Sequence, residues 1–599
     1  MKEEYSFNNR EIAAILRNVS AAYEIRGENR FKIVAYDRTA TAVEHSTTDV
    51  KDLWGDNLLS TIPGVGPSIA SHLDELFRTG RVKHFDRLLK GLPPAMFEFL
   101  SVPGIGSKIA FKLCKKLKIT KKEGALEKLR QAAQAGRIQN IEGFGKLSEA
   151  KILESLAQFG RRERRLLLPI AYEYASQIVE HLKKCPQVLR SDPLGSLRRK
   201  NATVGDIDIA VVSNQPKKVI EFFTSFPRAR QIIEAGENKA RILIANDIQV
   251  DLMVEPPKSY GSLLQHFTGS KQHNIALREY ALKKGMSLSE HGIKKTQNSK
   301  QKTFIYSTEK KFYEAFGMVW IPPELREDKG EIELALENKL PKLVEPKDIK
   351  GDLHIHSDFD IETSHDEGRS NLEEIHEKAV SLGYEYIALA EHNPSASKHS
   401  DVEIIDLIKR KKKIVDQFNY SREKLKTDSS KKVFIFNSLE VDIQPDGKRA
   451  VPDKALEYLD FAVVSVHSSF RMSKDKMTKR ILTALDHPKV KILGHPTGRK
   501  LLEREGYEID WDKLFAFCVK NKKFLEINCW PDRLDLPDSL IREAIGAGTK
   551  LVINTDSHEV GDMDLMQYGV WTARRGWAKN NDIINCLSYN KINSKLMAK

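Results

Sequence analysis

The stretch from Gly195 to Val212, GSLRRKNATVGDIDIAVV, constrains the fold of this 599-residue chain more than any other. It ends in an apolar, β-branched run that predicts a strand. Because side chains in a strand alternate between two faces, Asp206 and Asp208 share one face. A second strand-like run, IQVDLMV, carries Asp251. Carboxylates held in this way can share two divalent cations, the arrangement used for in-line phosphoryl transfer.

Groups suited to phosphate come before these carboxylates. Gly195 and Ser196 offer backbone N–H groups and a hydroxyl, and Arg198 and Arg199 add fixed positive charge. A D-x-D pair on its own is more often an exposed strand edge beside a solvated turn. The Gly-Ser pair, the basic turn and the third aspartate together favour a catalytic site over that alternative.

This stretch resembles the palm motif of the family X DNA polymerases, the polymerase-beta-like nucleotidyltransferases. It departs from the usual pattern at Ala202, where many members carry an acidic residue. The resemblance implies that the three aspartates hold two Mg²⁺ or Mn²⁺ ions, with Asp251 assisting deprotonation of the primer 3′-hydroxyl. It also implies a nucleotide triphosphate site, made of Gly195, Ser196, Arg199 and Gly205.

An internal repeat precedes this motif. The segment IPGVGPSIA at 62–70 returns as VPGIGSKIA at 102–110, and a weaker copy without the proline, IEGFGK, lies at 141–146. Glycine permits a tight turn and close approach to a ligand, and the next helix presents free N–H groups to phosphate. The repeats resemble helix-hairpin-helix motifs, although a helix connector without a ligand is the alternative. The implied DNA-backbone contacts are Gly64, Gly66, Gly104, Gly106 and Lys108.

A second nucleotide-binding element is predicted after the palm. The turn HFTGS at 266–270 leads into a helix that carries Asn274 and Arg278 on one face. Alone, it reads as an ordinary helix start capped by Ser270. It is similar to the nucleotide-selection subdomain of family X, in which Asn274 would contact the minor-groove edge of the incoming base and Arg278 the template. The remaining implied nucleotide contacts are His266, Phe267 and Gly269. Because His266 replaces the tyrosine of the animal members, the strength of deoxyribose selection stays open.

A different chemistry begins at Gly351. The run GDLHIHS places His354 and His356 on one strand face, and six further signals follow it. In five of them the candidate ligands stand at the C-terminal end of an apolar run that is typical of a β-strand. Helical patterns lie between these runs. Ligands at the carboxyl ends of successive parallel strands predict a (β/α) barrel with metal at its mouth. A capped strand end would explain any one histidine, but not seven such signals.

This set resembles the PHP (polymerase and histidinol phosphatase) domain, a distorted seven-stranded barrel with a three-metal site. The aspartate of that family follows the second histidine by five residues, so Asp360 competes with Asp366 here. The Glu367-Gly368 pair and the helix that follow favour Asp366. The nine implied ligands are His354, His356, Asp366, His392, Glu440, His467, His495, Asp556 and His558. Mixed imidazole and carboxylate ligands suit up to three Mn²⁺ or Zn²⁺ ions better than Mg²⁺ alone.

Composition agrees with a nucleic-acid partner. A net charge of +14 favours binding to a polyanion such as nucleic acid. An ordinary bias of the surface composition toward basic residues would give the same excess. The five cysteines form no C-x-x-C pair, which indicates a reducing compartment. The N-terminus does not read as a signal peptide, and no apolar run approaches the roughly 20 residues that span a bilayer. We therefore expect a cytoplasmic, nucleoid-associated protein without a membrane partner.

The chain as a whole is predicted to be a multidomain α+β and α/β protein, and the resemblance to family X covers essentially all of it. The predicted parts are a helical region with the first helix-hairpin-helix at 1–90, a fingers-like helix-hairpin-helix subdomain at 91–165, a palm at 166–258, a thumb-like nucleotide-selection subdomain at 259–323, a linker at 324–350 and a PHP barrel at 351–599.

The expected function is template-directed filling of short gaps in DNA repair, by a monomer that uses gapped or primed DNA and dNTPs. The PHP domain would add 3′→5′ exonuclease activity, with AP-site cleavage or 3′-phosphate removal as further options. Two alternatives stay open: a DNA-end-binding repair scaffold, and a small-molecule nucleotidyltransferase fused to a phosphoesterase.

One activity of the animal members is expected to be weak or absent. Those members remove a 5′-deoxyribose phosphate through a lysine Schiff base, and His72 stands at the corresponding position. An imidazole cannot form the iminium that this chemistry requires. Ser68 also replaces a nearby basic residue, and nothing in the spacing places Lys83 as a substitute.

Overall fold

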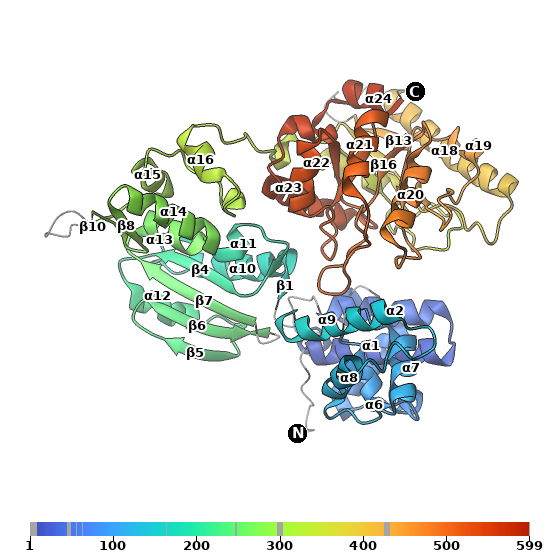
Figure 1. Ribbon diagram of the computed structural model, residues 1–599, viewed down its shortest axis with the longest axis horizontal. Helices are drawn as coiled ribbons and strands as arrows, with labels where there is room; N and C mark the ends of the chain where they lie inside the picture. The colour runs from blue at the N-terminus through green and yellow to red at the C-terminus, as the bar shows by residue number, and fades with distance from the viewer. Residues whose placement is uncertain are drawn as a thin grey trace.

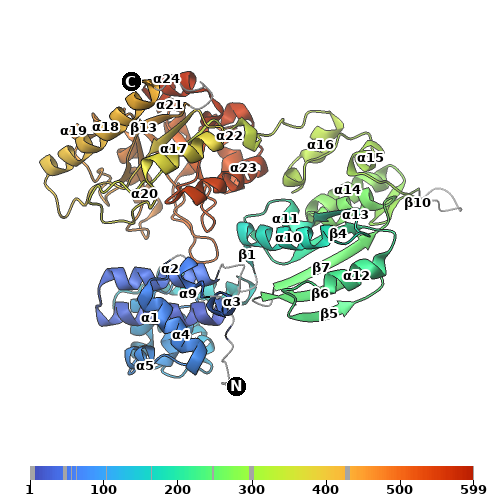
Figure 2. The same cartoon turned by 180° about the vertical axis from the view of Figure 1, so that it is seen from behind.

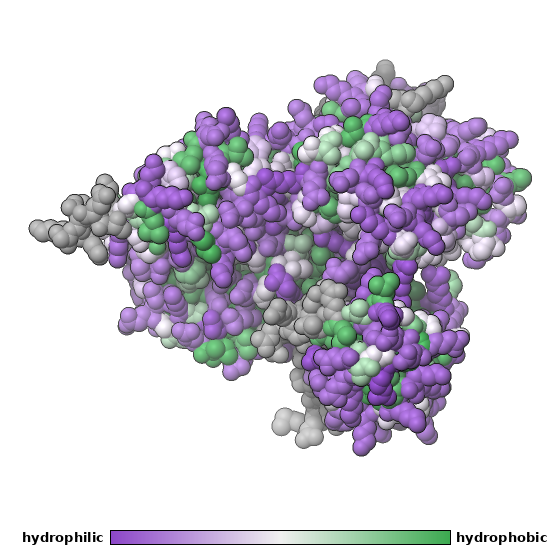
Figure 3. Space-filling model, in the orientation of Figure 1, coloured by the Kyte–Doolittle hydropathy of each residue, from purple (hydrophilic) through white to green (hydrophobic). Residues whose placement is uncertain are grey.

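The computed structural model describes residues 7, 9–44, 50–55, 57–62, 64–102, 104–162, 165–245, 248–295, 303–424 and 432–597. Figures 1 and 2 show three bodies: a helical N-terminal region, a central sheet with its helices, and a C-terminal α/β region. Hydrophilic residues predominate over the visible face of all three in Figure 3. Among the described residues, no helix is both long and apolar enough to cross a membrane.

The described N-terminal region, up to residue 162, is built of helices around two apolar cores. Ala21 and Ile25 of α1 pack in the second core, so the first helix joins the two units. The helices are α1 (Asn9–Arg26), α2 (Arg30–Glu44), α3 (Val50–Gly55), η1 (Leu59–Thr61), α4 (Pro67–Thr79), α5 (Lys83–Leu89), α6 (Pro94–Phe99), α7 (Ser107–Leu117), α8 (Ala125–Gln134) and α9 (Lys146–Arg162).

The central region is a five-stranded sheet in the order β2-β4-β7-β6-β5, with β4 and β7 parallel. Helices α10 and α12 share one core with the buried face of the sheet. Strands β5, β6 and β7 follow one another as antiparallel hairpins, since their connections are too short for a helical crossover. The elements are β1 (Leu166–Leu167), α10 (Leu168–Lys183), β2 (Arg190–Pro193), α11 (Gly195–Arg198), β3 (Thr203–Val204), β4 (Ile207–Val212), α12 (Pro216–Thr224), β5 (Gln231–Ala235), β6 (Lys239–Ile244) and β7 (Ile248–Glu255).

A smaller α/β unit follows, with a three-stranded antiparallel sheet. Its elements are α13 (Tyr260–Thr268), α14 (Lys271–Lys283), β8 (Met286–Ser289), β9 (Gly292–Lys295), β10 (Thr303–Phe304), α15 (Glu309–Glu314), η3 (Pro323–Leu325), α16 (Glu331–Leu336) and η4 (Pro346–Asp348). The segment we predicted as a linker is packed at both ends. Ile332 of α16 lies in the core of this unit, and Val344 lies in the C-terminal core.

The C-terminal region alternates parallel strands with helices, in two sheets ordered β11-β12-β13 and β14-β15-β16-β17-β18. A bridge between His392 and Glu440 joins the two sheets, and one between Ile355 and Ser557 brings the last strand beside the first. The strands are β11 (Gly351–Ile355), β12 (Tyr386–Leu389), β13 (Phe434–Asn437), β14 (Glu440–Asp442), β15 (Ala462–Ser465), β16 (Val490–Leu493), β17 (Phe524–Asn528) and β18 (Lys550–Asn554). The helices are α17 (Leu372–Ser381), α18 (Asp401–Lys424), α19 (Asp453–Leu456), α20 (Lys474–Leu485), α21 (Trp511–Asn521), α22 (Asp538–Gly546), η6 (Val560–Leu565), α23 (Met566–Arg575), η7 (Asn580–Asp582), η8 (Ile584–Cys586) and α24 (Tyr589–Met597).

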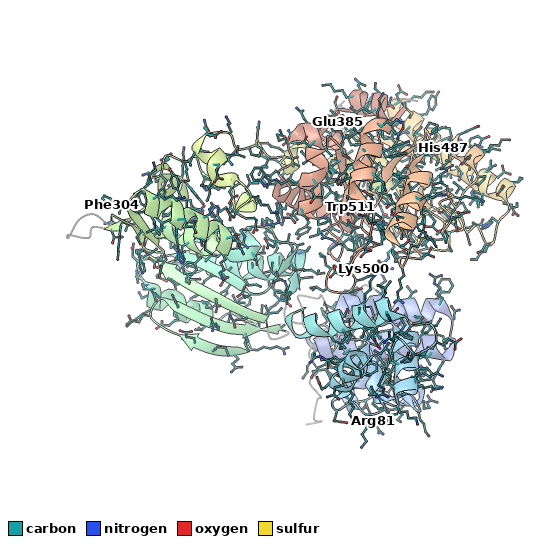
Figure 4. The ribbon with its side chains drawn as sticks, in the orientation of Figure 1. Arg81, Phe304, Glu385, His487, Lys500 and Trp511 are labelled. Atoms are coloured by element: carbon teal, nitrogen blue, oxygen red, sulfur yellow. The ribbon has the colours of Figure 1, made fainter. Side chains whose placement is uncertain are left out.

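The C-terminal region contacts both other bodies. Tyr568 and Trp571 of α23 pack in the core of the central sheet. On another side, the Arg471 guanidinium donates a hydrogen bond to the Gly104 carbonyl at 3.3 Å, within the second hairpin turn. Figure 4 likewise shows Lys500 at the edge of the C-terminal region that faces the N-terminal helices. The C-terminal region therefore lies against both other bodies, and the three form a triangular arrangement rather than a linear string (Figure 1).

Candidate active sites

The parallel pairing of β4 with β7 brings two of the predicted palm carboxylates side by side. Asp208 is directly opposite Asp251 in the register, and the exposed Asp206 lies just before β4. Burial, together with the negative charges of Asp206 and Asp251, raises the pKa of Asp208 to about 7. This concentration of negative charge fits a site that holds divalent cations.

An arginine balances part of that charge. Asp251 accepts hydrogen bonds from Arg241, at 2.5 Å to Oδ1 and 3.2 Å to Oδ2, and from the Gln249 amide at 2.9 Å. Arg241 comes from β6, where the register places it opposite Asp251. A carboxylate engaged in this way is a weak base and a partly occupied ligand, so a catalytic role for Asp251 would require Arg241 to turn away.

Helix α11 begins at the carboxylates. Gly195 has φ +56°, and a Cβ added there would lie 3.0 Å from Asp208 Oδ2. Glycine is therefore required both by the backbone conformation and by the close approach. Ser196 follows it in α11, and Gly205 is exposed just before β4. The structure thus gathers these three predicted triphosphate residues around the end of β4.

The basic turn after α11 is not free, since each of its three cations has a partner from another part of the chain. Arg198 pairs with Glu309 through two hydrogen bonds of 2.8 and 2.6 Å. Arg199 donates to Glu327 at 3.0 Å and to the Thr268 carbonyl at 2.5 Å. Lys200 lies 3.6 Å from the ring centroid of Trp571. For Arg199 to bind a triphosphate it must therefore exchange the Glu327 carboxylate for phosphate.

The predicted nucleotide-selection turn meets this basic turn. A Cβ added at Gly269 would lie 3.2 Å from Arg199 Nη1. The rings of His266 and Phe267 are edge-on to one another, with centroids 4.9 Å apart. Asn274 donates to the His266 carbonyl at 2.7 Å, which fixes the amide near the same turn. Ser270 caps α14 as expected, accepting from the His273 N–H at 3.2 Å, and Arg278 is exposed one turn beyond Asn274.

The three glycine repeats adopt one local structure. Gly64, Gly104 and Gly143 all lie in the left-handed region, at φ +86°, +84° and +83°. Each turn is closed by an equivalent hydrogen bond, from Val65 to Ile62, from Ile105 to Val102 and from Phe144 to Ile141, at 3.0, 3.0 and 2.9 Å. The weak third copy is therefore a hairpin of the same kind.

Helices α4 and α7 start directly after Gly66 and Gly106, and neither has a side-chain cap. The N-terminal N–H groups are thus available to a phosphate at these two hairpins. Lys108 in the first turn of α7 is largely exposed, with its ammonium 3.7 Å from Glu24. Ser107 donates a hydrogen bond to the same Glu24 carboxylate, so an acidic side chain of α1 lies at the second hairpin.

The C-terminal region gathers eight of its nine predicted ligands into tight clusters. Within the described chain, four groups of histidines and carboxylates have ligand atoms within 4.8 Å of one another, all in this region. They are His354, His356, Glu440 and Asp556; Glu440, His467 and His495; His356, His392 and His558; and His365, His392 and His467. These residues follow or begin the parallel strands, so they meet at one end of the ring of strands.

Buried polar atoms in these clusters lack hydrogen-bond partners. They are His354 Nε2, His356 Nδ1, His392 Nδ1, Glu440 Oε2, His495 Nδ1 and His558 Nε2. Burial opposes the charged form of His354, but the carboxylates of Glu526 and Asp556 outweigh it and hold its pKa well above the usual value. Orphaned imidazole and carboxylate atoms that converge in a buried site fit transition-metal ions well.

Asp366, the ninth predicted ligand, is more exposed but lies beside the clusters. Its two oxygens are 3.8 Å from His392 Nε2 and 3.6 Å from His558 Nε2. Asp360 instead accepts a hydrogen bond from the Glu362 N–H of its own loop at 2.9 Å. The geometry therefore favours Asp366 over Asp360 as the ligand.

Our sequence reasoning missed three members of this site. Glu526 accepts from His354 Nδ1 at 2.7 Å and from the His495 N–H at 2.7 Å. Asp442 pairs with His467 Nδ1 at 2.6 Å and with His365 Nε2 at 2.9 Å. Such partners fix the tautomer and orientation of a ligating imidazole. The available signals were a lone glutamate inside the apolar run FLEIN and an aspartate two residues after Glu440.

Comparison with known proteins agrees with this geometry. The DNA polymerase/3′-5′ exonuclease PolX of Bacillus subtilis (strain 168) is 32% identical over 591 residues, which cover 98% of this chain and 99% of that protein. The chain belongs to the family X DNA polymerases. Family models of a helix-hairpin-helix domain, a SAM-like helix-hairpin-helix tandem and the DNA polymerase beta thumb match residues 7–82, 97–158 and 263–327 of this family X polymerase.

More distant relatives match parts of the family X chain. DNA polymerase lambda of Rattus norvegicus is 23% identical over 48% of this chain and 49% of its own length. A protein of Thermoanaerobacter sp. (strain X514) named as a probable phosphatase is 26% identical over 31% of this chain and 77% of its own length. The polymerase thus shares sequence with both polymerases and a phosphatase-like protein.

The N-terminal region of this family X polymerase has an aromatic and imidazole cluster around His72. The Tyr36 hydroxyl lies 2.6 Å from His72 Nδ1, and the Tyr23 hydroxyl lies 2.6 Å from His84 Nε2. The two imidazoles are stacked, with ring centroids 5.0 Å apart. Burial lowers the pKa of His72, so this side chain is neutral at physiological pH.

Proposed function

We propose that this family X enzyme is a template-directed DNA polymerase that fills short gaps during DNA repair. The observation that carries the proposal is the parallel register of β4 and β7, which sets Asp208 opposite Asp251 at the start of α11. The relative named as a polymerase and exonuclease matches along nearly the whole chain, which supports the same pair of activities here.

In this proposal Asp206, Asp208 and Asp251 hold two Mg²⁺ or Mn²⁺ ions. When bound, divalent ions supply positive charge for the attacking and leaving oxygens. Asp251 accepts the proton of the primer 3′-hydroxyl once Arg241 has turned away.

The first turn of α11 and Arg199 hold the triphosphate, while His266, Phe267, Gly269 and Asn274 surround the sugar and base. The hairpins at Gly64, Gly66, Gly104 and Gly106 grip the DNA backbone without reading sequence, as does Lys108, and Arg278 contacts the template.

The C-terminal region is, in this proposal, a PHP barrel that degrades DNA from 3′ ends. Its eight strands reduce to the expected seven when β13 and β14, separated only by Ser438 and Leu439, are counted as one interrupted strand. Its nine ligands, with Asp366 among them, hold up to three Mn²⁺ or Zn²⁺ ions. Glu526 and Asp442 orient the imidazoles. The likeness to a phosphatase-named protein supports a phosphoesterase, and AP-site cleavage or 3′-phosphate removal would use the same centre. We further propose a cytoplasmic monomer that acts on gapped or primed DNA with dNTPs.

The deciding experiment incubates a gapped duplex with the purified protein and Mg²⁺ or Mn²⁺. We expect gap filling with dNTPs, and 3′-end degradation without them. Binding of the duplex without either reaction would favour a DNA-end scaffold. A nucleotidyl transfer to small molecules, with DNA binding that lacks a steep salt dependence, would favour the second alternative.

A further inference from the structure

The C-terminal region reaches the nucleotide-binding turn of the palm through α23. Lys200, in the left-handed conformation at φ +59°, packs over two adjacent aromatic rings, 4.4 Å from the Tyr172 centroid and 3.6 Å from that of Trp571. Tyr568 and Trp571 also pack in the palm core. The turn that follows α11 is therefore built partly from the palm and partly from α23.

Arg575, the last residue of α23, makes the polar part of this contact. Its Nη1 donates to the Arg199 carbonyl at 2.8 Å, to Asn201 Oδ1 at 2.7 Å and to Glu327 Oε1 at 3.0 Å. Its Nη2 donates to Asp538 at 2.9 Å. Only 9% of the side chain is exposed, so all of these bonds are shielded from water. Arg575 thus fixes the C-terminal end of α11, whose other end lies against Asp208.

One carboxylate oxygen is shared by two arginines. Glu327 Oε1 accepts from Arg199 Nε and from Arg575 Nη1, both at 3.0 Å. When Arg199 turns to a triphosphate, Glu327 would be left as a partly buried, unpaired charge unless a second cation stays beside it. An uncompensated buried charge is costly. Arg575 is placed to be that second cation.

We propose that Arg575 is a positioning residue for nucleotide binding, through which the C-terminal region holds the α11 turn and keeps Glu327 paired while Arg199 engages the incoming dNTP. This inference rests on the proposed polymerase function. It assigns to the C-terminal region a part in synthesis that is separate from its own metal centre. The hydrogen-bond partners of Arg575 given above include neither a proposed metal ligand nor a palm carboxylate.

The test measures steady-state gap filling with Arg575→Ala, Arg575→Lys and Arg574→Ala. Arg574 is the matched control, since it lies next in α23 but donates to Glu324 and the Val344 carbonyl and to none of the partners of Arg575. We expect Arg575→Ala to raise the KM for dNTP roughly tenfold or more, with a smaller change in kcat. Arg575→Lys should restore part of the loss, and Arg574→Ala should leave the KM unchanged.

A second arm distinguishes positioning from general loosening. Without Arg575, Glu327 would hold Arg199 more tightly, so Glu327→Gln should lower the raised KM when added to Arg575→Ala. An additive loss in the double variant, or equal effects of Arg575→Ala and Arg574→Ala, would overturn the inference.

The 3′→5′ degradation rate reports whether the C-terminal region is folded. If Arg575→Ala does not fold, Arg575→Lys and Glu327→Gln decide, because an unchanged KM in both contradicts the proposal. Failure of the wild type to extend any primer would instead contradict the polymerase function itself.

Discussion

Asp208 shows how strongly the local fold sets the chemistry of one side chain. Its pKa of about 7 means that the folded, metal-free protein keeps a proton that the unfolded chain releases near its usual value of 3.8. Because the pKa of Asp208 is higher in the folded protein than in the unfolded chain, protonation of Asp208 stabilises the fold, fully so at pH values below 3.8. This stabilisation declines as the pH rises and is lost once the pH has passed about 7. Bound cations would remove the loss by compensating the ionised carboxylate.

The first prediction concerns this pH dependence. In EDTA, the Tm of the wild type should fall from pH 5 to pH 8 by more than that of Asp208→Asn, which carries no titrating carboxyl there. Adding Mg²⁺ should restore the wild type at pH 8 and have less effect on the variant. Thermal melts across this range check it. Parallel melting curves for the two proteins would show that Asp208 titrates as an ordinary carboxyl.

Glu526 carries the second prediction. It orients His354 through Nδ1 and also receives the His495 N–H, so Glu526→Gln leaves all nine proposed ligands but loosens two of them. Loss of such a partner typically lowers metal affinity by about 10–100-fold. Titration with Mn²⁺ or Zn²⁺ measures this, and Asp453→Asn, at an exposed pair with Arg449, is the control. Unchanged affinity in Glu526→Gln would remove Glu526 from the site.

His72 carries the third prediction, an absence of 5′-deoxyribose phosphate lyase activity. Its imidazole is held by Tyr36 and stacked on His84, and it offers no primary amine for a Schiff base. Borohydride reduction in the presence of a 5′-deoxyribose phosphate duplex should give no efficient covalent adduct. An adduct that disappears on mutating a lysine of the first 90 residues would show that another nucleophile serves.

Much of the residue-level site could be predicted because motif residues sit at fixed offsets within one strand or one turn. Glu526 and His354 are different, since they are 172 residues apart and meet across the interior of the ring of strands. His365 likewise joins a cluster only because its loop lies beside Asp442 and His467, which are 77 and 102 residues further along the chain. Contacts of this kind form only when the whole ring of C-terminal strands has closed. They therefore produce no periodic pattern in the local sequence.

At the scale of elements, the second hairpin combines an attractive and a repulsive group. Lys108 is exposed in the first turn of α7, and Glu24 of α1 lies within 3.7 Å of its ammonium. DNA phosphate would have to share this helix end with a carboxylate. If the hairpin grips the DNA backbone as proposed, Glu24 of α1 would weaken that grip.

The fourth prediction follows from that arrangement. Lys108→Ala should weaken binding to gapped duplexes of any sequence and reduce the slope of log K against log salt by about 1. Glu24→Gln should act in the opposite direction and tighten binding, since it removes a negative charge from the phosphate position. Binding titrations over a salt series measure both. Weaker binding by Glu24→Gln would mean that Glu24 acts mainly as a structural cap of α7.

Elements with strong local patterns were predicted well, and those decided by packing were not. The glycine hairpins follow from φ > 0 requirements that few residues other than glycine meet, so even the weak copy at Gly143 has the same turn. The segment at 324–350 looked like a linker because it is rich in Glu and Lys. Its few apolar residues, such as Ile332 and Val344, nevertheless pack in two different cores.

At the scale of the whole molecule, motifs in the sequence predicted two candidate active sites, but no motif predicted the contact between the halves. Arg575 and the Arg199 carbonyl that it binds are 376 residues apart. The basic turn read as a free triphosphate site, because three cations in a row give no sign that Glu309, Glu327 and Trp571 will occupy them. Only the assembled fold shows that all three cations already have partners, so that a triphosphate would have to displace Glu327 from Arg199.

The last prediction is that point changes separate the two activities although the halves are docked. Asp208→Asn removes a palm ligand and leaves α23 and the C-terminal clusters intact, so synthesis should fall by orders of magnitude while 3′→5′ degradation persists. His354→Ala should abolish degradation and reduce bound metal, with gap filling retained, because α23 packs on the palm through Tyr568, Trp571 and Arg575 rather than through the metal site. Primer extension, nuclease assays and metal analysis on the same preparations check both variants. Equal loss of both activities in either variant would mean that the two centres work as one, since the docking contacts themselves are untouched by these substitutions.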